Sequence, residues 1–306
     1  MTSETSAYAW LEAPALAVID RSAAERLSWL KGQDDWIPYP RANELLASMH
    51  ELIVRPRHHR MRGMLVIGES NNGKSRLARE CLARHPMSES PDGDHIMLPV
   101  LLLEMPPRPD ENEILDALLQ MLNQPFRRKA PIGDKRQQVI HVLKRCELRA
   151  LLVDEVQRLL GARHDMRRVV MDALRFIANQ VPVPLIVFST PRGANALASS
   201  DEMINRLHPE ALPIWKLDDD YRRLLATYLR RLPLREQSPL TTKAMAVLVH
   251  TLTEGLLGEA RDLLESATQI AFDRDLEKID EAILRAVPWT PPSERKRMIG
   301  VPGRIV

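Results

Sequence analysis

The chain has 306 residues, of which 44% are hydrophobic, so it can hold one large domain and a smaller one, each with its own core. Its 43 basic and 41 acidic residues leave a net charge of +2, which neither indicates nor excludes a nucleic-acid partner. No apolar run approaches membrane-spanning length, and no basic region followed by an apolar one opens the sequence. We therefore expect no membrane span, no signal peptide and a cytoplasmic location. The two cysteines and nine histidines show no metal-type spacing, so we expect free thiols and no structural metal.

The first 60 residues predict two helices before any strand. Residues 21–32 have the pattern of a short helix, and the two prolines of the following segment, at positions 38 and 40, break regular structure there. Residues 41–54 have apolar side chains at helical spacing, and a basic loop follows at 55–60.

The most specific pattern of the chain comes next. An apolar run at 64–67 predicts a buried strand, and a helical pattern occupies 76–84. Between them the sequence reads G-x-x-x-x-G-K-S, the pattern of a phosphate-binding loop. Lys74 should reach the β- and γ-phosphates of ATP, and the Ser75 hydroxyl should ligate Mg²⁺. The predicted ATP-binding residues of this loop are Gly68, Glu69, Ser70, Asn71, Asn72, Gly73, Lys74 and Ser75.

Strands and helices alternate after the loop. Continuous apolar strands between helices indicate a parallel sheet with helices on both faces. The expected strands are 98–104, 150–153, 184–190 and a short last one at 212–215, and the expected helices are 112–123, 135–147 and 166–179.

The strand at 150–153 ends in two carboxylates, which is the Walker B pattern. Asp154 should hold the Mg²⁺ shell, directly or through water, and Glu155 should polarise the water that attacks the γ-phosphate. A strand that ends in Asp-Glu is common, but its pairing with a phosphate loop is specific. The presence of Glu155 favours hydrolysis over binding alone.

After residue 217 the strands stop, and helical patterns at 219–231, 241–251, 258–273 and 280–286 predict an all-helical domain. The last segment holds Trp289, nearby prolines and three consecutive basic residues, with too little apolar content for a core. We expect that tail to be mobile in the free protein and to contact a partner, the alternative being a disordered end without a role. The predicted divisions are an extension at 1–40, an ATPase core at 41–217, a helical lid at 218–287 and the tail at 288–306.

A parallel ATPase core followed by a helical lid resembles the AAA+ class. The expected fold class is therefore α/β, a P-loop AAA+ domain with a parallel sheet flanked by helices, followed by a small all-helical lid domain.

The AAA+ resemblance implies roles for three further residues. Thr190, at the end of a predicted strand, matches the sensor 1 position that orients the attacking water; the alternative is a turn cap. Arg206 matches the arginine finger, which reaches the γ-phosphate of a neighbouring subunit; the alternative is a solvated arginine at a helix end. Arg261 matches the sensor 2 contact to the γ-phosphate; the alternative is a salt bridge with Glu265.

A closer resemblance, over residues 25–285, is to the TniB/TnsC family of AAA+ regulators of DNA transposition. The segments that carry it are 36–41, 68–75, 100–110, 152–155, 204–207, 212–215, 232–234 and 254–258. Two positions depart from the family pattern: Leu207 replaces an aromatic residue after the finger arginine, and Ser189 replaces a glycine before the sensor threonine.

This resemblance implies a regulator that binds ATP with Mg²⁺ and assembles as a homo-oligomer, a ring or a helical filament, on double-stranded DNA. Such proteins recruit and activate a transposase at target DNA, and some contact a TniQ-type targeting protein. ATP hydrolysis controls their disassembly, and they do not cut DNA.

A basic loop between two predicted helices supports DNA contact from the residues themselves. Arg127, Arg128 and Lys129 follow one another there, and Arg108 lies in the turn after the second predicted strand. The family places nearby positions against phosphates. Basic loops bind duplexes without sequence preference through counterion release, and no helix-turn-helix reader is evident. The alternative is a solvated basic loop. Residues 55–60 are a second candidate for DNA contact, but their place just before the first strand favours an ordinary surface loop.

Other function classes remain open. A P-loop kinase would need a phosphate-acceptor pocket, and the helical domain and Arg206 disfavour it. An AAA+ ATPase of DNA replication or repair, of the clamp-loader or initiator-loader type, shares the same motifs. A scaffold that binds nucleotide without hydrolysis is disfavoured by Glu155.

Overall fold

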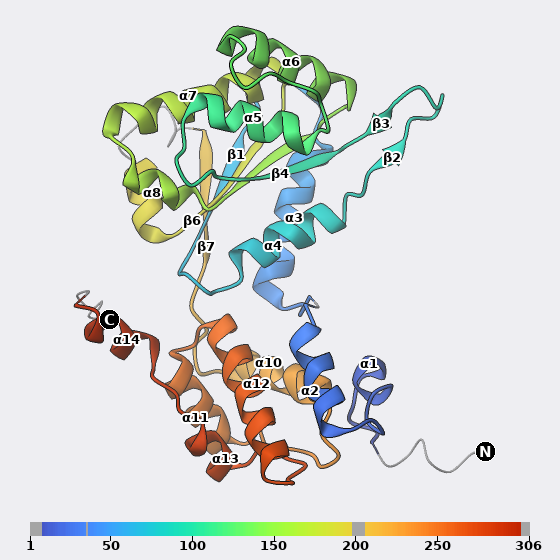
Figure 1. The fold of residues 1–306 in the computed structure, drawn as a ribbon, viewed down its shortest axis with the longest axis vertical. Helices are drawn as coiled ribbons and strands as arrows, with labels where there is room; N and C mark the ends of the chain where they lie inside the picture. The colour runs from blue at the N-terminus through green and yellow to red at the C-terminus, as the bar shows by residue number, and fades with distance from the viewer. Residues whose placement is uncertain (1–7, 35, 198–205, 301–306) are drawn as a thin grey trace. The chain divides into compact units, whose positions relative to one another are not determined.

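The computed structural model describes residues 8–34, 36–197 and 206–300 (Figure 1). The chain divides into two compact units: residues 40–213, and residues up to 39 together with those from 214 onward. Residues 201–205, which precede the expected finger arginine, and 301–306, at the end of the basic tail, lie outside the described ranges. Within those ranges, no helix is long and apolar enough to cross a membrane.

The larger unit is built on a five-stranded sheet with the strand order β4-β5-β6-β1-β7. Every neighbouring pair in it is parallel, so the carboxyl ends of all five strands lie along one edge, which we call the carboxyl edge. The strands are β1 (Gly63–Gly68), β4 (Val100–Glu104), β5 (Ala150–Asp154), β6 (Leu185–Ser189) and β7 (Leu207–Leu212).

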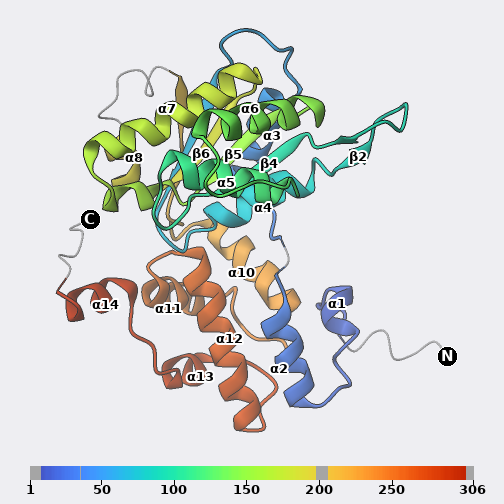
Figure 2. The same ribbon diagram turned by 45° about the horizontal axis from the view of Figure 1, so that its top comes forward.

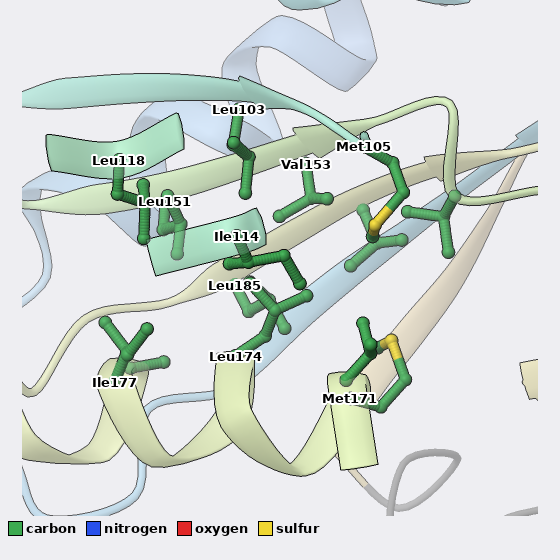
Figure 3. Close-up of a cluster of buried hydrophobic side chains, with 14 of the residues drawn as sticks. Leu103, Met105, Ile114, Leu118, Leu151, Val153, Met171, Leu174, Ile177 and Leu185 are labelled. Carbon is green, nitrogen blue, oxygen red and sulfur yellow. The ribbon is translucent and has the colours of Figure 1, made fainter. Parts of the chain in front are cut away.

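Helices cover both faces of this sheet, which confirms the expected α/β class (Figures 1 and 2). Alternate strand residues such as Leu151 and Val153 point into one core with helices α5, α6 and α7 (Figure 3). Helix α4 contacts the central strands as well, and α3 packs against α4 and β7. The elements between and around the strands are α3 (Pro40–Val54), α4 (Lys74–Ala83), α5 (Glu111–Met121), α6 (Ile132–Arg145), η1 (Val156–Gly161), α7 (His164–Gln180) and α8 (Pro191–Leu197).

The strand expected at 212–215 is wrong, because the last strand lies earlier, at Leu207–Leu212. Its sequence contains Pro209 between a histidine and a glutamate, and does not read as a strand. Proline is tolerated there because β7 is an edge strand, which pairs with β1 alone among the strands that the structure describes. A short hairpin of β2 (Ser88–Glu89) and β3 (Ile96–Met97) was also missed.

The smaller unit is helical, and the four helices expected after residue 217 are all present. Asp218, Thr242 and Asp280 each accept a hydrogen bond from a first-turn N–H group and so cap three of them. The helices are α1 (Ala13–Leu16), α2 (Ala23–Gly32), α10 (Asp219–Arg231), α11 (Lys243–Thr253), α12 (Leu257–Asp273), α13 (Glu281–Ala286) and α14 (Pro292–Met298).

The segment before residue 40 is an integral part of this helical unit. Arg26 on α2 is only 2% exposed, and its guanidinium donates to Pro233 O at 2.8 Å and to both carboxylate oxygens of Glu277. The same group lies 4.5 Å from the centroid of the Phe272 ring. A buried charge needs partners of this kind, so these contacts fix where α2 packs.

The expectation of an unpacked tail is wrong for residues 288–298. Trp289 Nε1 donates to Leu252 O at 2.9 Å, and its ring packs on the core of the helical unit. The Ser293 N–H donates to the carboxylate of Glu254 at 3.0 Å, and Arg295 pairs with Glu259. One aromatic side chain and three polar contacts therefore hold this segment on the helical unit, although its low apolar content does not predict packing.

The buried pair on α2 gives a stability prediction. Arg26→Ala removes the arginine that pairs with both carboxylate oxygens of the partly buried Glu277, so it should destabilise the helical unit by about 3 kcal/mol. Arg222→Ala removes an exposed ion pair with Asp219 from the same unit and should cost under about 1 kcal/mol. Chemical unfolding followed by circular dichroism measures both. Equal, small losses would show that Arg26 is dispensable for the packing of α2.

The Arg26–Glu277 pair also makes the stability of the helical unit depend on pH. Burial acts to raise the Glu277 pKa, but hydrogen bonds from Arg26 and from the Arg235 N–H, with the charges of both arginines, lower it overall. A carboxylate with a lowered folded-state pKa contributes stability that is complete above its ordinary pKa and lost as pH falls through the lowered value. The difference between wild type and Arg26→Ala should therefore shrink on acidification below the ordinary glutamate range.

Candidate nucleotide site

The phosphate-loop sequence occupies the turn between β1 and α4, at the carboxyl edge. Asn71 and Gly73 have positive φ angles of 59° and 86°, the left-handed region that curls the loop. A Cβ on Gly68 would lie 3.0 Å from Leu212 O and 3.3 Å from Lys74 Cγ, so glycine permits close packing at the start of the loop. Helix α4 begins at Lys74, and its first N–H groups have no intrahelical partners.

Lys74 lies inside the protein, with 5% of its side chain exposed. Its Nζ donates to Glu69 O across the loop at 2.8 Å. Burial lowers its pKa, while the negative charges of Asp154, Glu155 and Glu69 act to raise it. The structure therefore brings the loop lysine and the two carboxylates after β5 into one electrostatic cluster.

The two carboxylates follow β5 in different environments. Asp154 is 5% exposed, and its Oδ1 accepts the N–H of Glu155 at 2.8 Å. Glu155 has a φ of 59°, a left-handed conformation that is uncommon for glutamate and that turns its side chain out of the strand direction. Its Oε2 accepts a hydrogen bond from Gln157 Nε2 at 2.9 Å, and Arg158 Nε lies 3.9 Å from it.

These residues fit ATP with Mg²⁺. The loop offers backbone N–H groups at the positive end of a helix, and Lys74 supplies a cation. A hydroxyl on Ser75 and a carboxylate on Asp154 are the hard oxygen ligands that Mg²⁺ prefers.

Thr190 follows β6 at the same edge, and β6 lies between β5 and β1. Its Oγ1 accepts the Gly193 N–H at 3.3 Å, which is the capping contact of the alternative interpretation. The hydroxyl proton is still available to a water, so the sensor 1 role stays a prediction. The preceding Ser189 is fully buried, and its Oγ has no partner in the described part of the chain.

Arg206 lies at the opposite edge of the sheet. Gly63 pairs with Leu207 and Gly68 with Leu212, so Arg206 precedes β7 while the phosphate loop follows β1. Six residues of strand separate Arg206 from the level of the loop, roughly 20 Å at about 3.3 Å each, which exceeds the reach of an arginine side chain. Its Nη1 donates to Asn179 Oδ1 at 2.8 Å.

Arg261 lies in the helical unit and contacts the segment before residue 40. Its Nη2 donates to Gln33 O at 2.5 Å, and its Nη1 is 3.8 Å from Asp34 Oδ1. The carboxylate that faces it therefore comes from a distant segment, whereas the alternative interpretation placed Glu265 there. Its sensor 2 role stays a prediction.

The basic residues expected at DNA are all exposed. Arg127, Arg128 and Lys129 lie in the loop between α5 and α6, and Arg108 lies between β4 and α5. Buried Lys135 organises this region, because its Nζ donates to Arg128 O at 2.8 Å and to Asn112 and Asp116 on α5. The loop is thus held near the amino-terminal end of α5, the end that lies just after Arg108 in the sequence.

Sequence reasoning missed two side chains that hold Glu155 and its surroundings. Gln157 and Arg158 lie in η1, directly after the strand, and Arg158 also donates to Met105 O and to Glu104 at 2.5 Å. A polar residue two or three positions after the second carboxylate is the local signal. A short 3₁₀ turn turns these positions back toward the strand end.

The model of the family described as "Bacterial TniB protein" matches residues 26–217. No curated protein matches the sequence.

Solved structures of similar fold include the ADP form of the ORC2 protein of Aeropyrum pernix, with a TM-score of 0.58 and 16% identity over 84% of this chain and 71% of that one. Cdc6p from Pyrobaculum aerophilum gives 0.57 and 16% over 88% and 73%. The Aeropyrum pernix ORC1 protein in complex with DNA gives 0.53 and 15% over 87% and 68%. These likenesses support the AAA+ P-loop fold.

The site predicts different effects for its lysine and its second carboxylate. Lys74→Ala should abolish ATP binding, because the phosphate charge loses its buried partner. Glu155→Gln should keep binding and lose turnover, because an amide does not accept a proton from water. Isothermal titration and phosphate release measure the two effects, with Glu236→Gln, on the helical unit, as a control that should change neither. Turnover by Glu155→Gln at the wild-type rate would refute the role given to Glu155.

Proposed function

Since the chain belongs to the bacterial TniB family, we propose that it is an ATP-dependent, DNA-binding regulator of transposition. The observation that carries the proposal is the cluster of Lys74, Asp154 and Glu155 at one edge of a parallel sheet, in a chain of this family. That cluster has the parts for ATP hydrolysis, and the family supplies the biological setting.

Within the proposed reaction, each side chain has one task. Lys74 and the N–H groups of the loop bind and orient the β- and γ-phosphates. Ser75 and Asp154 would hold Mg²⁺, which supplies positive charge beside the transferred phosphate. Glu155 accepts the proton of the attacking water, and Gln157 keeps its carboxylate oriented.

Arg206 supports a dependence of hydrolysis on assembly. It lies at the edge of the sheet opposite to the phosphate loop of its own unit. If it is the arginine finger, it serves the nucleotide of a second copy, and an isolated subunit lacks that transition-state charge. We therefore include homo-oligomerisation, as a ring or a filament, in the proposal.

The exposed loop at Arg127, Arg128 and Lys129, with Arg108, is the proposed DNA contact. Among the described residues, none of these four side chains has a hydrogen bond or an ion pair, so their charge is available to phosphates. Buried Lys135 holds the loop backbone, which lowers the entropy lost on binding. Recruitment of a transposase, contact with a TniQ-type protein and a cytoplasmic location complete the proposal, on the strength of the family.

The trans role of Arg206 can be tested by mixing variants. Arg206→Ala should bind ATP and hydrolyse it on the order of 10³-fold more slowly, the lower end for an arginine finger. Adding Lys74→Ala subunits should restore part of the activity, because they supply Arg206 to sites with an intact Lys74. A defect below about tenfold, or no recovery on mixing, would make Arg206 a surface residue.

DNA binding can be tested by its salt dependence. Alanine at Arg127, Arg128 and Lys129 should weaken duplex binding equally for unrelated sequences and lower the salt slope by up to about three units. Alanine at Arg55 and Arg60, two exposed arginines before β1, is the matched control and should leave the slope unchanged. Fluorescence anisotropy across a salt series provides the slope. If the control variant lowers the slope and the loop variant does not, the DNA contact lies elsewhere.

A further inference from the structure

One phosphate-loop residue makes contacts that nucleotide binding does not require. Asn72 is 1% exposed, and its Nδ2 donates to Leu212 O at 3.1 Å and to Pro213 O at 2.8 Å. Both acceptors are carbonyls, which fixes the orientation of the amide, since its oxygen would repel them. Its Oδ1 is buried without a partner among the described residues. Burying half of an amide unsatisfied is unfavourable, so the two donated bonds account for asparagine at this position.

The two carbonyls occupy a special place in the chain. Leu212 is the last residue of β7, and Pro213 is the last residue of the larger unit. The next residue, Ile214, already belongs to the helical unit. Asn72 therefore holds the chain at the point where it leaves the sheet.

The helical unit holds the same connection from its own side. The Trp215 N–H donates to Gly255 O at 3.0 Å, and Trp215 O accepts a hydrogen bond from His250 Nε2 at 2.9 Å. Gly255 has a φ of +70°, and a Cβ there would lie 2.3 Å from Trp215 O, so only glycine allows this approach. Ile214 is thus the single residue between Pro213, which is bonded to the phosphate loop, and Trp215, which is bonded to His250 and to the loop after α11.

The other connection between the units is tied to the same places. Arg41, at the start of α3, donates to Ala211 O at 2.9 Å and pairs with Glu210 on β7. Within the helical unit, the Tyr39 ring packs against Trp215, with centroids 4.8 Å apart. Both connections are therefore fixed to the end of β7 in one unit and to Trp215 in the other.

We propose that Asn72 is a positioning residue that couples the phosphate loop to the helical unit through the connection at 212–215. This inference rests on the proposed nucleotide site. Bound phosphate moves or rigidifies the loop, Asn72 passes that change to the carbonyls of Leu212 and Pro213, and Trp215 passes it to His250 and Gly255. A one-residue spacer leaves little slack to absorb the change, so the helical unit responds to the nucleotide through this connection.

The test is amide hydrogen exchange at the Trp215 N–H, with and without a slowly hydrolysed ATP analogue. Affinities are measured first, and each protein is compared at its own saturating concentration. In the wild type, nucleotide should change the Trp215 exchange rate by at least about fivefold, the lower end of typical couplings between sites. In Asn72→Asp, which keeps the shape and loses both donors, that change should disappear.

A second variant keeps the test decisive if Asn72→Asp binds nucleotide too weakly to saturate. His250→Phe keeps a ring against Tyr221, whose centroid lies 5.2 Å away, but does not donate to Trp215 O. It should bind nucleotide and also lose the response at Trp215, and the double variant should match the single ones.

Either variant retaining the wild-type response, or a wild type that binds nucleotide without any response at Trp215, would overturn the coupling. A wild type that binds no nucleotide would instead refute the proposed function, and the affinity measurement shows that before any exchange experiment.

Discussion

The candidate site depends on one charged group held inside the protein, the ammonium of Lys74. Burial disfavours the charged form of this group, and the carboxylates of Asp154 and Glu155 at the end of β5 oppose that effect. A phosphate chain would bring further negative charge to the same ammonium group. The site therefore suits a phosphate anion that carries a metal cation. The carboxyl ends of β1, β5 and β6 lie together at the same edge of the sheet, around the Lys74 ammonium.

The sequence was sufficient for the local structure of the two motifs. The phosphate loop and the Walker B strand each combine an apolar strand with a polar terminus, and both lie as predicted at the ends of β1 and β5. The helices after residue 217 were equally readable from their periodicity and capping residues. In a parallel sheet the carboxyl ends of strands that are distant in sequence share one edge, which is why the two motifs could be expected on the same edge.

What the sequence did not reveal depends on pairs of distant residues. Nothing local in the sequence indicates that Arg26 on α2 meets Glu277, or that Asp34 after α2 meets Arg261. The residues before 40 were therefore expected to be a separate extension. Strand β7 was missed because an edge strand tolerates proline and polar residues. The contacts of Asn72 could not be predicted because its two acceptors, at the end of β7, lie 140 and 141 residues away in the sequence.

The most direct test of the account is ATP turnover by the purified protein with and without duplex DNA of unrelated sequences. An ATP-switched, DNA-assembled regulator predicts slow turnover alone and a marked, sequence-independent rise with duplex, since assembly on DNA brings Arg206 of one copy to the site of another. Turnover that is fast without DNA and unchanged by it would fit a self-sufficient P-loop enzyme and contradict the account. Nucleotide binding without turnover under either condition would indicate a scaffold that uses ATP only to fix its shape.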